Sequence, residues 1–276
     1  MKNTILLFTL LLFGYSVFSQ EKIKGSKIVT VEKKETKEFD NLEADGNLEL
    51  FLIKGDKCGI EIEADDNLHD IIEINQNGST LQLSSTKEVK KAKKFSVRIT
   101  YTDDFKMAVV KNKTTITALE EMVLNDFTFK SFNDAKIFAN VKTKKFTLFA
   151  NDKSKIELNS KSAETTIELS QNAQMKALIS SEKLTIDMYQ KTTATVEGDA
   201  VNLKLRLDNN AEFTGRKLTS KNAEITTEEN ANCSIVVDTK ASINASGKSE
   251  IQLFGTPKIE LTNFTDSAIL YKKPLK

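Results

Sequence analysis

The one histidine of the sequence, His69, lies in an acidic segment, residues 65–70 (DDNLHD), that has donor atoms suited to a metal ion. The carboxylates of Asp65, Asp66 and Asp70 are oxygen ligands of the kind that calcium accepts. Zinc sites usually combine several histidine or cysteine side chains, and this segment has only one. Because strand-like segments flank these residues, we expect a solvated turn here and no metal site.

Hydrolysis by a Ser-His-Asp triad would need His69 to be oriented by a carboxylate and to face a serine on a strained turn. The sequence has no GxSxG motif to build that turn, and it also lacks a P-loop, a GxGxxG and an HExxH motif. Polysaccharide cleavage by acids, or by acids with lysine or arginine, would need such residues clustered on the outer surface. We expect no catalytic residue, no cofactor and no enzyme activity.

The charges give no overall field, because 40 Lys and Arg residues balance 39 Asp and Glu residues and leave a formal charge of +1. The basic run at residues 90–94 is expected to be a solvated loop. Nucleic-acid binding would also need exposed aromatic side chains, and Phe129, Phe146 and Phe213 fall on positions expected to face inward. We therefore expect no nucleic-acid partner.

Two cysteines, Cys58 and Cys233, lie at apolar positions of strand-like segments. A disulfide would require their Cα atoms to be close. We expect both to be buried as small hydrophobic side chains, without a disulfide.

Residues 1–19 have the pattern of a secretory signal peptide. Lys2 supplies the positive charge, residues 5–13 form an apolar run too short to span a bilayer, and residues 17–19 (VFS) resemble a cleavage site. No cysteine lies at the cut, so we expect no lipid anchor. We expect export to the periplasm, the outer-membrane surface or the extracellular space, and no membrane span in the mature chain.

A short pattern recurs in residues 111–272 at an interval of about 19 residues. Its apolar anchor row is Ile116, Ile137, Ile156, Met175, Ala194, Phe213, Cys233, Ile251 and Ile269. Two residues before each anchor lies a small residue, which gives the row Thr114, Ala135, Ser154, Ala173, Thr192, Ala211, Ala231, Ser249 and Ser267. Eight residues before the anchors from Ile137 onward lies a large apolar row: Phe129, Leu148, Ile167, Ile186, Leu205, Ile225, Ile243 and Leu261. Three rows in constant register indicate a repeat protein.

Within each repeat the apolar residues alternate with polar ones, as in Leu203, Leu205 and Leu207, which is the period of a strand. A repeat of strands and turns this short must bury its apolar face against its neighbours. We therefore predict an all-β fold, a right-handed single-chain parallel β-helix of about nine coils of ~19 residues, with like residues stacked about 4.8 Å apart. A polar row is expected at the turns, because such side chains tolerate left-handed backbone: Asn133, Asp152, Gln171, Gln190, Asn209 and Glu229.

Residues 20–110 alternate as strands but do not follow the repeat. Glycine-containing turns such as Gly46-Asn47 and Asn77-Gly78 separate the strand-like segments. We expect an irregular β-rich N-terminal part that begins the β-helix and caps its open end, followed by the regular β-helix over residues 111–272. The two parts are expected to form one continuous domain.

Residues 51–85 (FLIKGDKCGIEIEADDNLHDIIEINQNGSTLQLSS), followed by FSVRITY and the repeat, resemble the putative auto-transporter adhesin head GIN domain family. The resemblance extends over roughly residues 39–272. It implies a β-helical domain of a secreted Gram-negative protein with no established biochemical activity. The turns here read NDA, DKS, QNA and NNA, where the family's coils usually carry Gly-Ser-Gly.

These observations predict a non-catalytic secreted cell-envelope protein, an adhesin-like recognition or structural module. Its partner would be a glycan or a protein of the cell surface, bound on a flat face where Asn, Gln, Lys and Thr recur at strand spacing. Two alternatives stay open: a polysaccharide-acting β-helix enzyme, and a periplasmic scaffold for a protein partner.

Overall fold

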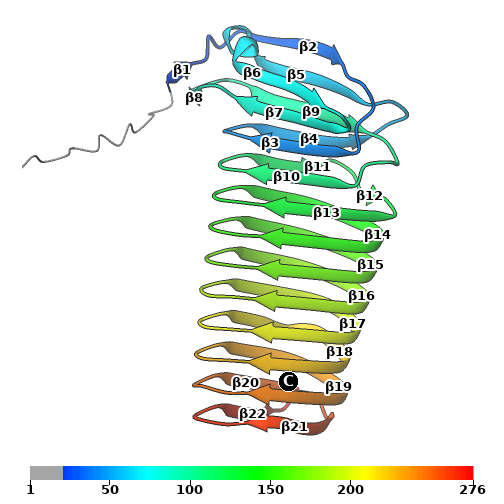
Figure 1. Ribbon diagram of the computed structural model, residues 1–276, viewed down its shortest axis with the longest axis vertical. Coiled ribbons are helices and arrows are strands. Elements are labelled where there is room, and N and C mark those ends of the chain that lie inside the picture. The colour runs from blue at the N-terminus through cyan, green and yellow to red at the C-terminus, as the bar shows by residue number, and fades with distance from the viewer. Residues whose placement is uncertain (1–20, 276) are drawn as a thin grey trace, which may run out of the picture.

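A computed structural model describes residues 21–275 of the chain, so the signal peptide predicted at residues 1–19 lies outside the described residues. The predicted β-helix is confirmed: successive strands stack in parallel to form a long tube (Figure 1). The regular strands are β13 (Asp126–Ser131), β14 (Lys136–Ala150), β15 (Lys155–Leu169), β16 (Gln174–Met188), β17 (Thr193–Leu207), β18 (Glu212–Thr227), β19 (Asn232–Ala245), β20 (Glu250–Phe254), β21 (Lys258–Phe264) and β22 (Ile269–Lys273).

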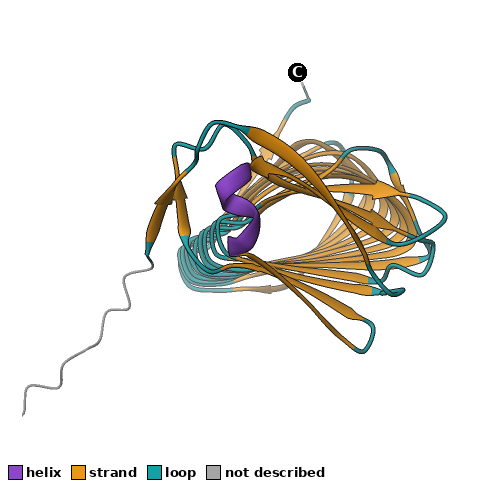
Figure 2. Cartoon of the chain, turned by 90° about the horizontal axis from the view of Figure 1, so that it is seen from above, coloured by secondary structure: helices purple, strands orange, loops and turns teal. Residues whose placement is uncertain are grey.

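The tube has two walls, joined on one side by tight turns and on the other by bends within the long strands (Figure 2). We call wall A the face that carries the large apolar row, and wall B the face that carries the anchor row. In β14, residues 145–150 belong to wall A and residues 136–142 to wall B. Each residue pairs with its equivalent one coil away, as Leu148 does with Ile167 and Ile137 with Ile156. The parallel register explains why the rows are visible in the sequence.

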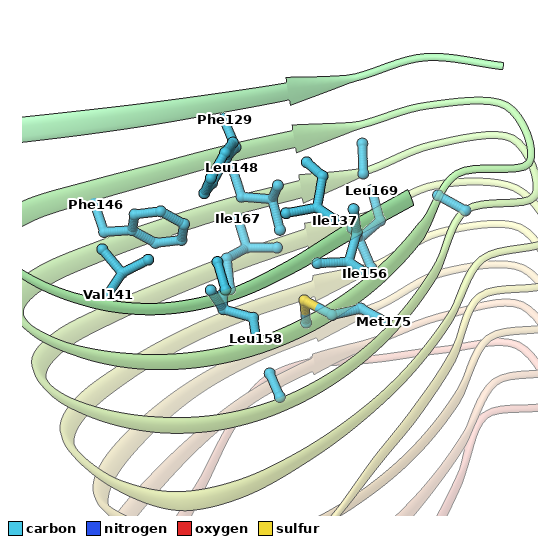
Figure 3. Close-up of a cluster of buried hydrophobic side chains, with 14 of the residues drawn as sticks. Phe129, Ile137, Val141, Phe146, Leu148, Ile156, Leu158, Ile167, Leu169 and Met175 are labelled. Carbon is cyan, nitrogen blue, oxygen red and sulfur yellow. The ribbon is translucent and has the colours of Figure 1, made fainter. Parts of the chain in front are cut away.

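The inside of the tube is filled by the predicted rows. The small row is fully buried from Thr114 to Ser249, and the large apolar row is buried from Phe129 to Ile243. Figure 3 shows Phe129, Leu148 and Ile167 of the large apolar row, together with Ile137, Ile156 and Met175 of the anchor row. Aromatic rings pack together towards the N-terminal end of the tube, where the ring centroid of Phe127 lies 4.7 Å from that of Phe129, which it contacts edge-on, and 5.1 Å from that of Phe105. Burial of these rows is the main stabilising contribution to the fold.

The turns have the predicted left-handed backbone. The polar row from Asn133 to Glu229 has φ values between 57° and 63°, and Asn112 and Asp266 share this conformation. The turns also bond to one another, since the amide of Lys153 donates to the carbonyl of Asn133 and that of Asn172 to Asp152. The left-handed residues therefore align the turns from coil to coil.

The last coil corrects one predicted register. Ile251 pairs with Leu270, so Leu270 continues the anchor row, whereas Ile269 pairs with the outward-facing Glu250. The spacing is 19 residues and not 18, and Ala268 takes the place that the sequence pattern gave to Ser267. In the sequence, Ser267 and Ala268 are both small, and Ile269 and Leu270 are both apolar, so the repeat pattern fits either register.

The N-terminal strands join the same rows in an order that differs from their order in the chain. They are β1 (Lys22–Lys24), β2 (Val29–Glu35), β3 (Asn41–Asp45), β4 (Glu49–Lys54), β5 (Gly59–Asp65), β6 (Ile72–Asn77), β7 (Thr80–Ser85), β8 (Glu88–Lys90), β9 (Phe95–Tyr101), β10 (Met107–Lys111), β11 (Thr115–Ala118) and β12 (Met122–Val123). The coil of β3 and β4 lies between that of β7 and β9 and that of β10 and β11. Leu42 thereby stacks between Leu81 and Ala108, although the spacing along the chain is irregular.

Antiparallel strands and a short 3-10 helix close the N-terminal end. β5 pairs with β9 and with β2, and β6 pairs with β7. The helix η1 (Asp66–Ile71) lies over the end of the tube (Figure 2), and two of its own side chains, Leu68 and Ile71, are buried. No helix among residues 21–275 is long and apolar enough to cross a membrane.

Candidate functional site

The segment with metal-ligand donors is not the solvated turn that the sequence predicted. Residues 66–71 form the 3-10 helix η1, and Asp65 before it is buried. The carboxylate of Asp65 is fully buried. It accepts hydrogen bonds from the backbone amides of Lys27 at 2.9 Å, Lys93 at 3.0 Å and Lys94 at 2.9 Å. Burial raises the pKa of Asp65, but these hydrogen bonds lower it further, so the pKa lies below the ordinary value of 3.8. Asp65 therefore holds the chain before β2 and the loop before β9 together. Among the described residues no group of three or more His, Cys, Asp and Glu side chains could hold a metal ion.

His69 contacts β2 and no serine of a triad. Its Nε2 atom lies 2.8 Å from the hydroxyl of Thr30, and its Nδ1 atom lies 3.3 Å from a carboxylate oxygen of Glu32. The second contact is an ion-pair distance without hydrogen-bond alignment, because Nδ1 has no hydrogen-bond partner. The histidine fastens β2 to η1.

The two cysteines are free, as predicted. Cys233 is buried in the anchor row, where burial raises the pKa of its thiol to about 12. Cys58 is half-buried, not buried, because it precedes β5, and its Sγ atom lies 3.2 Å from a carboxylate oxygen of Glu38.

A groove of about 440 Å³ runs along the outer face of wall B and crosses five coils. The two sides are rows of outward-facing residues, and the backbone of inward-facing residues such as Ala139 and Leu158 forms the floor. One side consists of Thr117, Phe138, Glu157, Lys176 and Thr195, and the other of Asn140, Asn159, Leu178 and Glu197. We call this the wall B groove. At about 4.8 Å per coil its four steps span about 19 Å.

The side chains of the wall B groove differ in kind from coil to coil. Asn159 donates its amide to the side-chain oxygen of Asn140 at 2.7 Å, which leaves further donor and acceptor positions of both amides free for a ligand. Phe138 is half-buried and presents part of its ring, and Leu178 is 52% exposed. Glu197 is bound to Lys217 at 3.0 Å. The groove thus offers amides, an aromatic ring, a carboxylate and an ammonium group in fixed register.

Strand geometry explains this arrangement. Alternate residues of a strand point to opposite sides, so Ile137, Ala139 and Val141 of β14 face the core while Phe138 and Asn140 face solvent. The parallel register then sets Phe138 beside Glu157, and Asn140 beside Asn159. The sequence predicted a polar outer face but did not single out these rows, because outward positions carry no constant residue type.

Wall A carries a groove of about 380 Å³ with mostly charged and amide side chains, including Lys183, Lys204 and Lys240. Several of these groups are bound to their neighbours: Lys183 to Glu164 at 2.7 Å, Lys240 to Glu260 at 2.9 Å, and the amide of Asn222 to Asn202 at 3.0 Å. Opposite charges on adjacent coils stabilise the ladder. The wall A groove is therefore largely self-paired.

One outward row of wall A brings two acids together. Glu168 pairs in register with Asp187, and Asp187 pairs with Arg206 on the next coil. Burial raises the pKa of Asp187 above 3.8, and Lys204 and Arg206 partly oppose this rise. Arg206 lies 3.0 Å from Glu228 and over the ring of Tyr189 at 5.7 Å. The sequence pattern does not reveal this pair, because the two acids are 19 residues apart and lie on an outward row that has no constant residue type.

A family model identifies the family of the chain, and solved structures have a similar fold. The family model described as "Putative auto-transporter adhesin, head GIN domain" matches residues 38–257. A putative adhesin from Parabacteroides distasonis has a similar structure, with a TM-score of 0.64 and 16% identity over 91% of this chain and 100% of the other. A putative lipid binding protein from the same species has a TM-score of 0.62 and 13% identity, over 92% of this chain and 98% of the other. A putative adhesin from Parabacteroides merdae has a TM-score of 0.58 and 16% identity, over 93% of this chain and 100% of the other. No curated protein matches the chain in sequence.

Proposed function

The chain belongs to the family of putative auto-transporter adhesins with a head GIN domain, and from this premise we propose that it is a non-catalytic recognition module that binds a polysaccharide along the wall B groove. It acts outside the cytoplasm, at the cell envelope. The signal-peptide pattern of residues 1–19 and the adhesin-like family support this location.

The chemistry of the wall B groove carries the proposal. A sugar ring has an apolar face and a rim of hydroxyl groups that donate and accept hydrogen bonds. The ring of Phe138 can pack against the apolar face of a sugar. The side-chain amides of Asn140 and Asn159 can bind its hydroxyl groups, because an amide both donates and accepts hydrogen bonds. The groove crosses five coils, so it fits an extended chain better than a single sugar.

Catalysis is the competing function, and it has a defined place on the molecule. Cleavage of a glycosidic bond needs an acid with a raised pKa beside a second carboxylate. The pair Glu168 and Asp187 approaches this requirement, but it lies on wall A, outside the wall B groove. Polysaccharide binding would therefore depend on side chains of wall B, and cleavage would depend on the two acids of wall A.

The test is incubation of the purified mature chain with immobilised neutral, acidic and amino-sugar polysaccharides, with retention and chain length both measured. We expect retention on at least one polysaccharide and no change in its chain length. Absence of retention on every polysaccharide would contradict the proposal. Cleavage that is lost in Asp187→Asn and kept in Asp104→Asn, an exposed carboxylate elsewhere, would identify an enzyme instead.

A further inference from the structure

The C-terminal end of the tube is open. Ile225 and Ile243 are fully buried, but Leu261, the next residue of the same row, is 52% exposed. Ile259 and Phe264, which continue the buried rows of Ala241 and Ala245, are 36% and 37% exposed. These side chains are exposed because no coil of the described chain covers them. The cross-section of the core thus reaches solvent at this end.

The backbone at this end is open as well. In the described residues β21 pairs with β19, and β22 pairs with β20, and neither has a second neighbour on its other edge. Unpaired edge strands with apolar side chains readily accept another strand. The end therefore offers both apolar area and two rows of backbone donors and acceptors.

The N-terminal end is different. It is covered by η1 and by the antiparallel strands, and the outermost strand of wall B, β2, carries charged residues at positions 32–35 (EKKE). Charged edge strands resist pairing with another chain. Head-to-tail stacking of copies is disfavoured for this reason, whereas contact between two open ends is not.

We infer that the C-terminal end binds the C-terminal end of a second copy, related by a two-fold axis that runs along the strands. Consecutive strands of the flattened coil run in opposite directions on the two walls, so this axis pairs β21 antiparallel with β22 of the other copy. Pairing of β22 with itself would gather the ammonium groups of Lys272 and Lys273 from both copies. β21 carries one lysine, Lys258, and one acid, Glu260, so pairing β22 with β21 brings fewer like charges together than pairing β22 with itself.

The size of the end is sufficient for a specific dimer. A strand of seven residues, such as β21, is about 24 Å long. Two walls about 10 Å apart with their side chains make an end roughly 20 Å wide, or about 500 Å² per copy. The total of about 1,000 Å² is at the threshold for a biological interface and suits a weak, reversible dimer, which backbone pairing between the strands strengthens.

The test is the molar mass of the mature chain in solution, measured by light scattering and sedimentation over a wide range of micromolar concentration. We expect a reversible dimer. Leu261→Lys should raise the dissociation constant by about tenfold or more, because it places a charge in the apolar contact. Val201→Lys is the matched control, since Val201 is 44% exposed on the side of the tube, and this variant should dimerise like the wild type.

Circular dichroism and thermal unfolding check that both variants fold. Amide exchange over residues 258–273 should slow as the concentration of the wild type rises, and it should stay constant in Leu261→Lys. A wild type that is monomeric at every concentration would overturn the inference. Equal weakening by Val201→Lys, or open-ended polymers instead of dimers, would also overturn it.

Discussion

The left-handed residues of the turns show how a single position specifies this fold. A non-glycine residue with positive φ is uncommon, and Asn and Asp are enriched among those that occur. Here Asn, Asp, Gln or Glu occupies that position in the turns from Asn112 to Glu229, and Gly247 takes it next, at φ 70°. The neighbouring small row is buried because the two walls meet at the turn. Both features follow from residue type and could be predicted from the sequence.

The small row provides a stability prediction at this scale. Ala211 is fully buried between Thr192 and Ala231 of the adjacent coils, so Ala211→Asp would bury a charge without a partner. We expect a loss of about 3–5 kcal/mol in the free energy of unfolding. Urea denaturation followed by circular dichroism measures this loss.

The next residue is the control for that variant. Glu212 faces solvent, and Glu212→Lys should change the free energy of unfolding by less than about 0.5 kcal/mol. Similar losses in the two variants would show that the register is displaced by one residue, because such a shift exchanges the two faces of a strand.

At the scale of elements, the N-terminal cap depends on a buried carboxylate. Asp65 accepts three backbone amides from two segments, and its pKa is lowered in the folded protein. A group with a lowered folded-state pKa stabilises the fold above its ordinary pKa, and the contribution is lost as the pH falls through the folded-state value. The cap should therefore weaken at pH values below 3.8.

Thermal unfolding as a function of pH tests this role of Asp65. Near neutral pH, Asp65→Asn should unfold at a lower temperature than the wild type, and the difference should shrink as the pH falls below 3.8. Asp104→Asn, which changes an exposed carboxylate, should follow the wild type at each pH. A constant difference between Asp65→Asn and the wild type down to low pH would mean that its charge does not stabilise the cap.

The elements also show where sequence patterns stop being informative. The coils of residues 111–272 repeat locally, so their strands, turns and buried rows are visible one after another. The N-terminal coils reach the same rows through pairings distant in sequence, such as Leu42 with Ala108, and no local spacing reveals that order. The wall B groove was equally hidden, because outward residues are free to vary and their grouping depends on the exact number of residues in each coil.

At the scale of the whole molecule, the two proposals combine into one arrangement. Because β21 of one copy pairs with β22 of the other, wall A of one copy continues into wall B of the other, and the two wall B grooves of the dimer would lie on opposite faces of a longer rod. Each groove would then hold a different polymer chain, so that one dimer links two chains, and avidity for a single chain would require that this chain occupy both sites together. The capped N-terminal ends would then lie at the outer ends of the rod.

The central claim is that wall B, and not wall A, is the recognition surface. The most direct test is the dissociation constant for a retained polysaccharide in matched pairs of variants. Phe138→Ala and Asn159→Ala change the wall B groove, while Phe149→Ala and Asn202→Ala change an aromatic residue and a hydrogen-bonded amide of wall A. We predict about tenfold weaker binding for each wall B variant and less than about twofold change for each wall A variant. Equal losses on both walls, or losses confined to wall A, would contradict the account.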